Sequence, residues 1–151
     1  MSSLIDVFRS TAGDFRWNGV ACLSYKDEGA APFCGVSRQS LFAGADLSCE
    51  LRYFEVASGG FSTLERHKHV HAVIILCGSG RVLVGREVFD VKPHDLIAIP
   101  SWTWHQFRAV HQSPLGFLCM VNAERDRPQL PTADDLAALC VDSRIAAFLS
   151  S

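Results

Sequence analysis

The sequence predicts an all-β fold, a single closed barrel followed by short C-terminal helices. Between residues 36 and 122, short apolar or alternating segments are interrupted by turn residues at close intervals, as is typical of closed antiparallel β structures. Helical patterns begin only after Asn122. The chain has 151 residues, a length that suits one domain with one core. We therefore expect a single domain over residues 1–151.

Residues 1–35 are expected to form an N-terminal arm and a first strand. Residues 1–19 show no clear hydrophobic period, so they are predicted to be a short helix or an arm along the domain surface. Residues 20–25 are the candidate first strand. The following residues 26–32 contain glycine, alanines and proline, and are predicted to be a loop.

The barrel core is expected to span residues 36–122. Residues 44–46 and the pair Gly85-Arg86 are the clearest turns, the second with the glycine of a two-residue hairpin loop. Both faces of the last predicted strand are apolar, so either face could point into the barrel. The predicted strands are residues 36–42, 49–56, 72–76, 81–84, 87–91, 96–99, 105–110 and 115–121.

Residues 123–151 are expected to form a helical extension. A charged connection over residues 124–128 leads to Thr132, which can cap a helix over residues 133–140. Asp142 or Ser143 can cap a second helix that ends at Leu149.

Charge and composition exclude several classes of partner. The formal net charge is -2, and lysine and arginine form no long run, so we expect no nucleic-acid partner. No segment approaches the roughly 18 apolar residues of a membrane-spanning helix, and no signal peptide is recognisable, so a cytoplasmic protein without a membrane partner is predicted. Its 6 cysteines form no Cys-x-x-Cys pair and are predicted to be free thiols.

Three of the 6 histidines lie within five positions of one another, at His67, His69 and His71. In an extended chain these side chains and that of Glu65 would lie on the same side. Imidazole and carboxylate are the ligands that first-row transition metals take, and His71 opens an apolar run. The pattern predicts a metal site at the mouth of a buried strand, against the alternative of a solvated surface strand.

This stretch resembles the first motif of the cupin family, which reads Gly, five residues, His, one, His, three or four, Glu, six, Gly. The glycines Gly59 and Gly78 fix the register. The resemblance then implies Glu65, His67 and His71 as metal ligands, with Glu65 at a family His position and His71 at the family Glu position. His69 is left beside them.

The alternative register starts the histidine pair at His67 and His69. It would place Val73 or Ile74 at the third ligand position, and neither side chain can bind a metal.

A second cupin motif reads Gly, five residues, Pro, one, Gly, two, His, three, Asn. Here Pro100 and His105 match it, whereas His94, Trp102 and Ala109 replace its other members. The resemblance covers about residues 40–122 and implies His105 as the fourth ligand. It also implies a double-stranded β-helix, or jelly-roll, barrel and a homodimer.

Four segments resemble one branch of the family, the 1-methylthio-D-xylulose 5-phosphate methylsulfurylases: residues 63–67, 104–109, 115–119 and 125–131. These are manganese cupins that use a thiol to remove a methylthio group. The resemblance implies that Cys119 is the catalytic thiol, that it faces the metal cavity with a lowered pKa, and that a small thiol such as glutathione resolves the mixed disulfide.

The donor types alone leave manganese, iron, nickel, cobalt and zinc open. A bound ion with free positions would polarise a substrate carbonyl, and His69 would be the base or would orient it. We therefore expect an enzyme that acts on a small oxygenated metabolite. The alternatives are a cupin dioxygenase, a sugar isomerase, a non-catalytic ligand-binding module and a scaffold with a structural metal.

Two further groups of residues are candidates near the site. Trp102 and Trp104 precede His105 and could form a wall of the pocket or a protomer interface, or simply pack. Arg108, Arg125 and Arg127 could bind a substrate phosphate, or be solvated surface charges.

Overall fold

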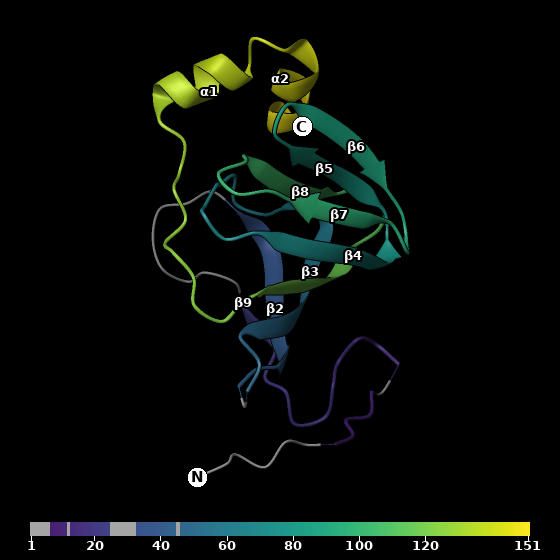
Figure 1. Cartoon of the computed structure of the whole chain (residues 1–151). Helices are drawn as coiled ribbons and strands as arrows, with labels where there is room; N and C mark the ends of the chain where they lie inside the picture. Colours follow the sequence, from purple (N-terminus) through teal and green to yellow (C-terminus); the bar gives the residue numbers. More distant parts are fainter. Residues whose placement is uncertain (1–6, 12, 25–32, 45) are drawn as a thin grey trace.

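The computed structural model describes residues 7–11, 13–24, 33–44 and 46–151. It shows a curled antiparallel β-sheet with two short helices at its C-terminal end (Figure 1), so the predicted fold class is confirmed. The elements are β1 (Leu23–Ser24), β2 (Cys34–Phe42), β3 (Cys49–Phe61), β4 (His71–Gly78), β5 (Gly80–Val84), β6 (Glu87–Val91), β7 (Leu96–Ile99), β8 (His105–Ala109), β9 (Leu115–Asn122), α1 (Ala133–Leu139) and α2 (Ser143–Ser150).

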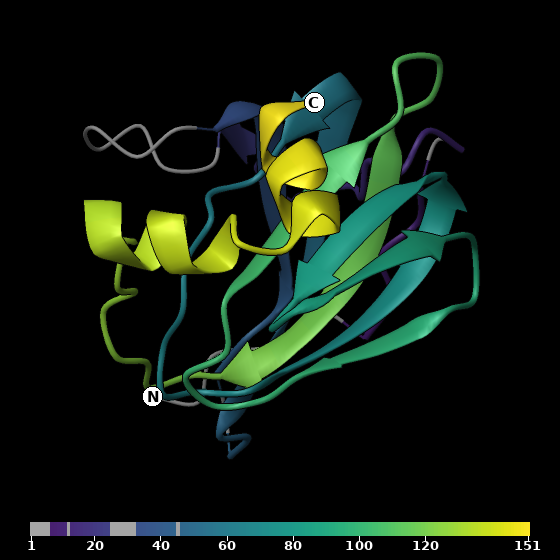
Figure 2. The same ribbon diagram turned by 90° about the horizontal axis from the view of Figure 1, so that it is seen from above.

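The hydrogen-bonded path through the sheet runs β6-β5-β8-β3-β9-β4-β7, and β2 adds to β3 outside this path. Strand β9 lies between β3 and β4, which are far apart in sequence. Figure 2 shows the strands of the curled sheet from above, with both helices at one side of it. Strands β6 and β7 are the two ends of the path among the described strands.

Alternation along the strands decides which side chains fill the barrel. On β9, Phe117 and Cys119 are buried, whereas Met120 is 51% exposed. The face that contains Leu115, Phe117, Cys119 and Val121 therefore points inward, which answers the question that two apolar faces left open. Phe54 and Phe107 stack against Phe117 at ring-centroid distances of 5.6 and 4.3 Å and continue this core.

The outer face of β3 is covered by residues from the N-terminal arm. The ring of Tyr53 stacks on Phe15 with 5.5 Å between centroids, and Trp17 packs beside it at 5.2 Å. The side chain of Gln39 donates to the backbone oxygen of Phe15. Between residues 7 and 24, the described part of the arm contains no helix.

Several element boundaries differ from the sequence prediction. Strand β3 continues to Phe61, which pairs with Cys34 and with Arg108, whereas the predicted strand ended at residue 56. A β-carbon at Gly60 would lie 2.4 Å from the backbone oxygen of Cys34, so the glycine permits this close pairing. Of the first predicted strand, only Leu23–Ser24 is observed. The predicted loop over residues 26–32, together with Tyr25 and Ala45, lies outside the described residues.

Both C-terminal helices form as predicted. Thr132 caps α1 in a reciprocal capping box with Asp135, and Asp142, rather than Ser143, caps α2. The helices contribute Leu139, Ile145 and Phe148 to a second apolar cluster outside the barrel. Within the described chain, neither helix has the length and apolar character that crossing a membrane requires.

Two turns show how this chain departs from the second cupin motif. His94 and Trp102 stand where the motif has glycines, and both keep a left-handed backbone, with φ of 77° and 55°. The turns therefore retain the conformation that glycine adopts without strain.

Candidate metal and thiol site

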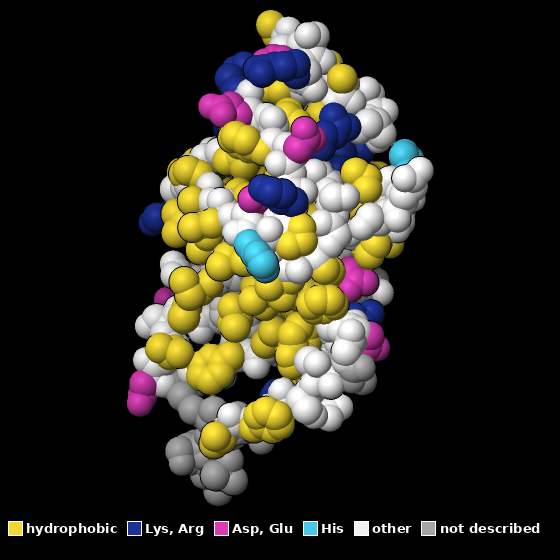
Figure 3. Space-filling view, turned by 90° about the vertical axis from the view of Figure 1, so that its right-hand side faces the viewer, with side chains coloured by type: hydrophobic (Ala, Val, Ile, Leu, Met, Phe, Trp, Pro, Cys, Tyr) yellow, Lys and Arg dark blue, Asp and Glu magenta, His cyan; other side chains and the backbone are white. Residues whose placement is uncertain are grey.

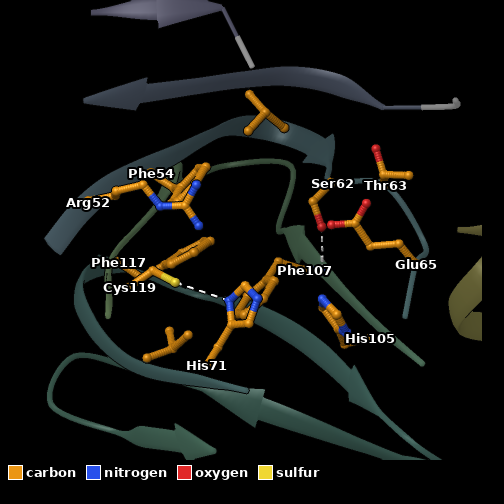
Figure 4. Close-up of a pocket in the computed structure, with 12 residues that line it drawn as sticks. Arg52, Phe54, Ser62, Thr63, Glu65, His71, His105, Phe107, Phe117 and Cys119 are labelled. Carbon is orange, nitrogen blue, oxygen red and sulfur yellow. Dashed lines mark hydrogen bonds between the residues drawn. The ribbon is translucent and has the colours of Figure 1, made fainter. Parts of the chain in front are cut away.

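The site lies in a small cavity of about 40 Å³ inside the curled sheet, and this cavity is partly open to solvent. Figure 4 shows side chains from the inner faces of several strands around this space. The lining residues are Val36, Arg52, Phe54, Ser62, Thr63, Glu65, His71, Val73, His105, Phe107, Phe117 and Cys119.

The connection between β3 and β4 brings the first two predicted ligands to the start of β8. Glu65 and His105 exchange backbone hydrogen bonds of 3.3 and 3.0 Å, which bring these two residues together. The side chains of Glu65, His67 and His105 are at most 6% exposed. Their donor atoms all lie within 4.8 Å of one another.

His71, the first residue of β4, completes the predicted set. Its Nε2 atom lies 3.0 Å from Nε2 of His67. A second group with donor atoms within 4.8 Å of one another contains His67, His69 and His71. The structure therefore brings all four predicted ligands together around His67 and adds His69 as a fifth nearby donor.

Backbone carbonyls fix the orientation of two imidazoles. Nδ1 of His67 lies 2.8 Å from the oxygen of His69, and Nδ1 of His105 lies 2.9 Å from the oxygen of Thr103. Because a carbonyl oxygen only accepts, each Nδ1 donates, and each Nε2 keeps a free lone pair. This is the arrangement in which a histidine binds a metal.

Burial keeps these imidazoles neutral. It lowers the pKa of His67, lowers the pKa of His71 to about 2 and lowers that of His105 to about 4. Neutral imidazole is the form that binds a metal, so the donor set, with the Glu65 carboxylate, fits a divalent transition-metal ion.

The expectation of a continuous extended segment from Glu65 to His71 is wrong. Strand β4 begins only at His71, and the preceding residues form a loop with isolated bridges. The backbone N–H of Trp102 donates to the oxygen of His67, and Oγ of Ser101 donates to that of Lys68. These bonds hold the loop against the second motif, so its backbone groups are satisfied without a strand partner.

His69 is buried, and its ring stacks on that of His67 with 3.6 Å between centroids. Its Nδ1 atom lies 2.7 Å from a carboxylate oxygen of Asp126. Asp126 could not be identified from the sequence, because the charged connection over residues 124–128 has no period that would distinguish one of its acids.

Cys119 lines the cavity, as the resemblance implied. It is 1% exposed, and its Sγ atom lies 3.1 Å from Nδ1 of His71 (Figure 4). The expected low pKa of this thiol is not found: burial raises the pKa of Cys119, although the guanidinium groups of Arg52 and Arg125 oppose that shift.

Arg52 lines the cavity and was likewise not identified from the sequence. It is 6% exposed and lies beside Phe54 on the inner face of β3. The sequence did contain an indication of this position: along the predicted strand, Arg52 lies on the same face as the apolar residues Phe54 and Val56.

The arginines that were considered for phosphate binding have other described contacts or lie outside the cavity lining. Arg108 donates to the backbone oxygens of Leu149 and Ser151 and so holds the end of α2. Arg125 forms an ion pair with Glu50. Arg127 is not among the residues that line the cavity.

Neither tryptophan lines the cavity. Trp104 is buried, and Cζ of Arg66 lies 4.4 Å from the centroid of its ring. Trp102 is 52% exposed, and neither residue is part of the cavity lining.

Comparisons with known proteins agree with this fold and site. Residues 52–121 match the family model described as Cupin domain. A protein from Rhodospirillum rubrum named 1-methylthio-D-xylulose 5-phosphate methylsulfurylase is 61% identical over 142 residues, which cover 94% of this chain and 91% of that protein.

Solved structures show the same similarity over nearly the whole chain. A cupin 2 conserved barrel domain protein from Rhodopseudomonas palustris is 60% identical, with a TM-score of 0.89 and coverage of 93% of this chain and 97% of that one. A cupin-2 domain from Rhodospirillum rubrum is 59% identical, with a TM-score of 0.87 and coverage of 95% and 96%. This chain therefore belongs to the cupin family.

Proposed function

We propose that this chain is a metal-dependent cupin enzyme that removes the methylthio group of a 1-methylthio-xylulose 5-phosphate-like substrate, with Cys119 as the acceptor. One observation carries the proposal: a buried thiol lies on the wall of the same cavity as three of the proposed metal ligands, Glu65, His71 and His105, with Sγ 3.1 Å from Nδ1 of His71. The 61% identity to a protein named for this reaction supports the choice of substrate.

The proposed metal ligands are Glu65, His67, His71 and His105. A bound divalent cation, manganese in our proposal, would act as a Lewis acid on the C2 carbonyl of the substrate. The chain's own contribution is to bring these four donors together around His67, with the buried imidazoles held neutral. Substrate oxygens can then approach from the open part of the cavity.

The tautomer of His71 links the ligand set to the thiol. When Nε2 of His71 serves as a ligand atom, the ring proton is on Nδ1. Nδ1–H then donates to Sγ of Cys119, 3.1 Å away, and a sulfur that accepts this bond is favoured as thiolate. The guanidinium groups of Arg52 and Arg125 act in the same direction.

In the transfer step, the Cys119 thiolate attacks the sulfur of the methylthio group. A bond forms between the two sulfurs, and the bond between that sulfur and C1 breaks. The electron pair of the broken bond moves to C1 and is delocalised onto the C2 oxygen. His69, oriented by Asp126, supplies a proton to C1, which gives the 1-deoxy ketose phosphate and a methylthio disulfide on Cys119.

Two thiol molecules, glutathione in our proposal, complete the cycle by exchange. The first forms a mixed disulfide with one sulfur, and the second releases it as a disulfide of the two thiols. Cys119 and methanethiol leave this sequence as thiols. The need for reduced thiols favours the cytoplasm as the location.

The experiment incubates metal-loaded protein with the methylthio substrate, first without thiol and then with glutathione. Without thiol, intact-protein mass spectrometry should find one methylthio group on the native chain and none on Cys119→Ser. With glutathione, the native chain should release methanethiol over many turnovers. Full turnover by Cys119→Ser would refute the thiol mechanism. Oxygen consumption or aldose formation would instead support the dioxygenase or isomerase alternatives.

A further inference from the structure

Two buried side-chain atoms have no hydrogen-bond partner in the described part of the chain, Nε of Arg52 and Oγ1 of Thr63. Both residues line the cavity of the metal and thiol site. Buried polar groups in native proteins are nearly always paired. Two unpaired groups in one cavity therefore indicate a ligand that pairs with them.

The position of Arg52 follows from the strand register. Arg52 on β3 is directly opposite Cys119 on β9, so both side chains leave the sheet on its inner face. Figure 4 shows the guanidinium of Arg52 on the same side of the cavity as Cys119, with Glu65 and His105 across from it. The guanidinium also lies over the ring of Phe54, 5.0 Å from its centroid.

No acidic side chain of the described residues forms an ion pair with Arg52. Glu50, two positions away on the same face of β3, is paired with Arg125 at 2.6 Å. Glu65 belongs to the donor group with His67 and His105. A guanidinium stays charged even when it is buried, and a buried charge without a counterion is strongly unfavourable. An anion that enters the cavity would remove this penalty.

We propose that Arg52 binds the anionic group of the substrate and selects phosphorylated over neutral substrates. The planar fork of a guanidinium matches the oxygens of a phosphate group. The identity of the phosphate as part of a sugar phosphate rests on the proposed function. The existence of an anion site beside Cys119 does not, because it is argued from the burial of Arg52 and from its unpaired Nε atom.

A binding experiment tests the anion site without any turnover. The thermal unfolding midpoint of the full-length native chain, Arg52→Met and Arg144→Met is measured with inorganic phosphate and with chloride at equal ionic strength. Arg144 is the matched control because its exposed side chain pairs with Asp142 outside the cavity. Phosphate should raise the midpoint of the native chain and of Arg144→Met, since a ligand that binds only the folded state stabilises it.

Arg52→Met should show no rise with phosphate. In chloride, its midpoint should equal or exceed the native one, because methionine removes the unpaired charge and keeps an apolar stem in the same space. An equal rise in all three proteins, or no rise in any, would overturn the proposal. A midpoint of Arg52→Met far below the native one in chloride would show that the arginine is structural, and would overturn it as well.

Steady-state kinetics of the metal-loaded enzyme identify the source of the anion. Hydrogen bonds to a charged group contribute about 1.5–3 kcal/mol, so KM for the sugar phosphate should rise roughly 10- to 100-fold in Arg52→Met. Arg52→Lys should recover part of this loss. The KM values for glutathione and for the uncharged 2-mercaptoethanol should stay at their native values.

A rise in KM for glutathione alone would assign Arg52 to the carboxylates of the thiol and overturn the substrate assignment. Phosphate-dependent stabilisation without methylthio transfer would reject the proposed function and retain the anion site. Methylthio transfer with an unchanged KM for the sugar phosphate in Arg52→Met would retain the proposed function and reject Arg52 as the residue that binds the substrate phosphate.

Discussion

The Nδ1 atom of His69 lies 2.7 Å from Oδ1 of Asp126, a residue 57 positions further along the chain. The same carboxylate accepts the backbone N–H groups of Lys68 and His69 at 2.8 and 3.0 Å. These hydrogen bonds hold the pKa of Asp126 well below its usual range. Asp126 therefore links the loop that contains Lys68 and His69 to the C-terminal connection. It also orients the His69 ring, to which we assign the proton transfer.

Asp126→Asn should lower kcat about 10- to 100-fold, the range found when a group that orients a metal-site histidine is lost. Asparagine keeps one carbonyl oxygen for the backbone but removes the carboxylate that lies 2.7 Å from Nδ1 of His69. The metal content should not change, because His69 is outside the proposed ligand set. Asp95→Asn is the control, since among the described residues that carboxylate accepts hydrogen bonds from Lys92 in a turn. An unchanged kcat in Asp126→Asn would contradict the role of His69.

Removing a proposed ligand should empty the metal site. His67→Ala and His105→Ala each delete an Nε2 donor whose orientation a backbone carbonyl fixes. We expect the metal affinity to fall at least tenfold, since even the residues that orient ligands contribute about this much. Elemental analysis of the purified proteins measures the loss. His111→Ala, at an exposed position, and Cys119→Ser should retain native metal content, and metal retention by both ligand variants would refute the assignment.

The metal-free protein should lose stability as the pH falls from 6.5 to about 4. Burial lowers the pKa of His105 from 6.5 to about 4 and that of His71 to about 2. In this window the unfolded chain binds protons at these residues and the folded chain does not, so the free energy of unfolding decreases as the pH is lowered. Chemical denaturation at a series of pH values measures this slope. The dependence of the free energy of unfolding on pH should be weaker in His105→Gln, because glutamine does not titrate in this window.

The sequence predicted the fold because the relevant signals are local. Turn residues and short alternating runs marked most strands, and Thr132 followed by Asp135 marked the capping box of α1. The ligands were predicted for the same reason, since the spacing of a motif is a property of consecutive residues. His105 was proposed as a ligand because the second motif has its own local pattern, not because its distance from Glu65 was known.

The rest of the site depends on contacts between segments that are distant in sequence. Asp126 meets His69 only when the C-terminal connection folds back over the loop, and nothing around it in sequence marks that contact. Arg52 faces Cys119 through the pairing of β3 with β9. The prediction of a low pKa for Cys119 was wrong for a related reason. Burial raises this pKa, and the depth of burial depends on all the strands that enclose the thiol.

His94→Gly should stabilise the protein slightly. His94 is exposed, and its φ of 77° lies in the left-handed region, which costs a residue with a β-carbon roughly 1–2 kcal/mol. Glycine removes this strain, but its backbone loses more conformational entropy on folding, which costs about 0.5–1 kcal/mol. The net gain is about 0–1.5 kcal/mol, and each kcal/mol gained should raise the thermal midpoint by roughly 2–4 °C. His94→Ala is the control, because it keeps the β-carbon and should show no such rise. A midpoint of His94→Gly below the native one would mean that the imidazole contributes more to this turn than its exposure indicates.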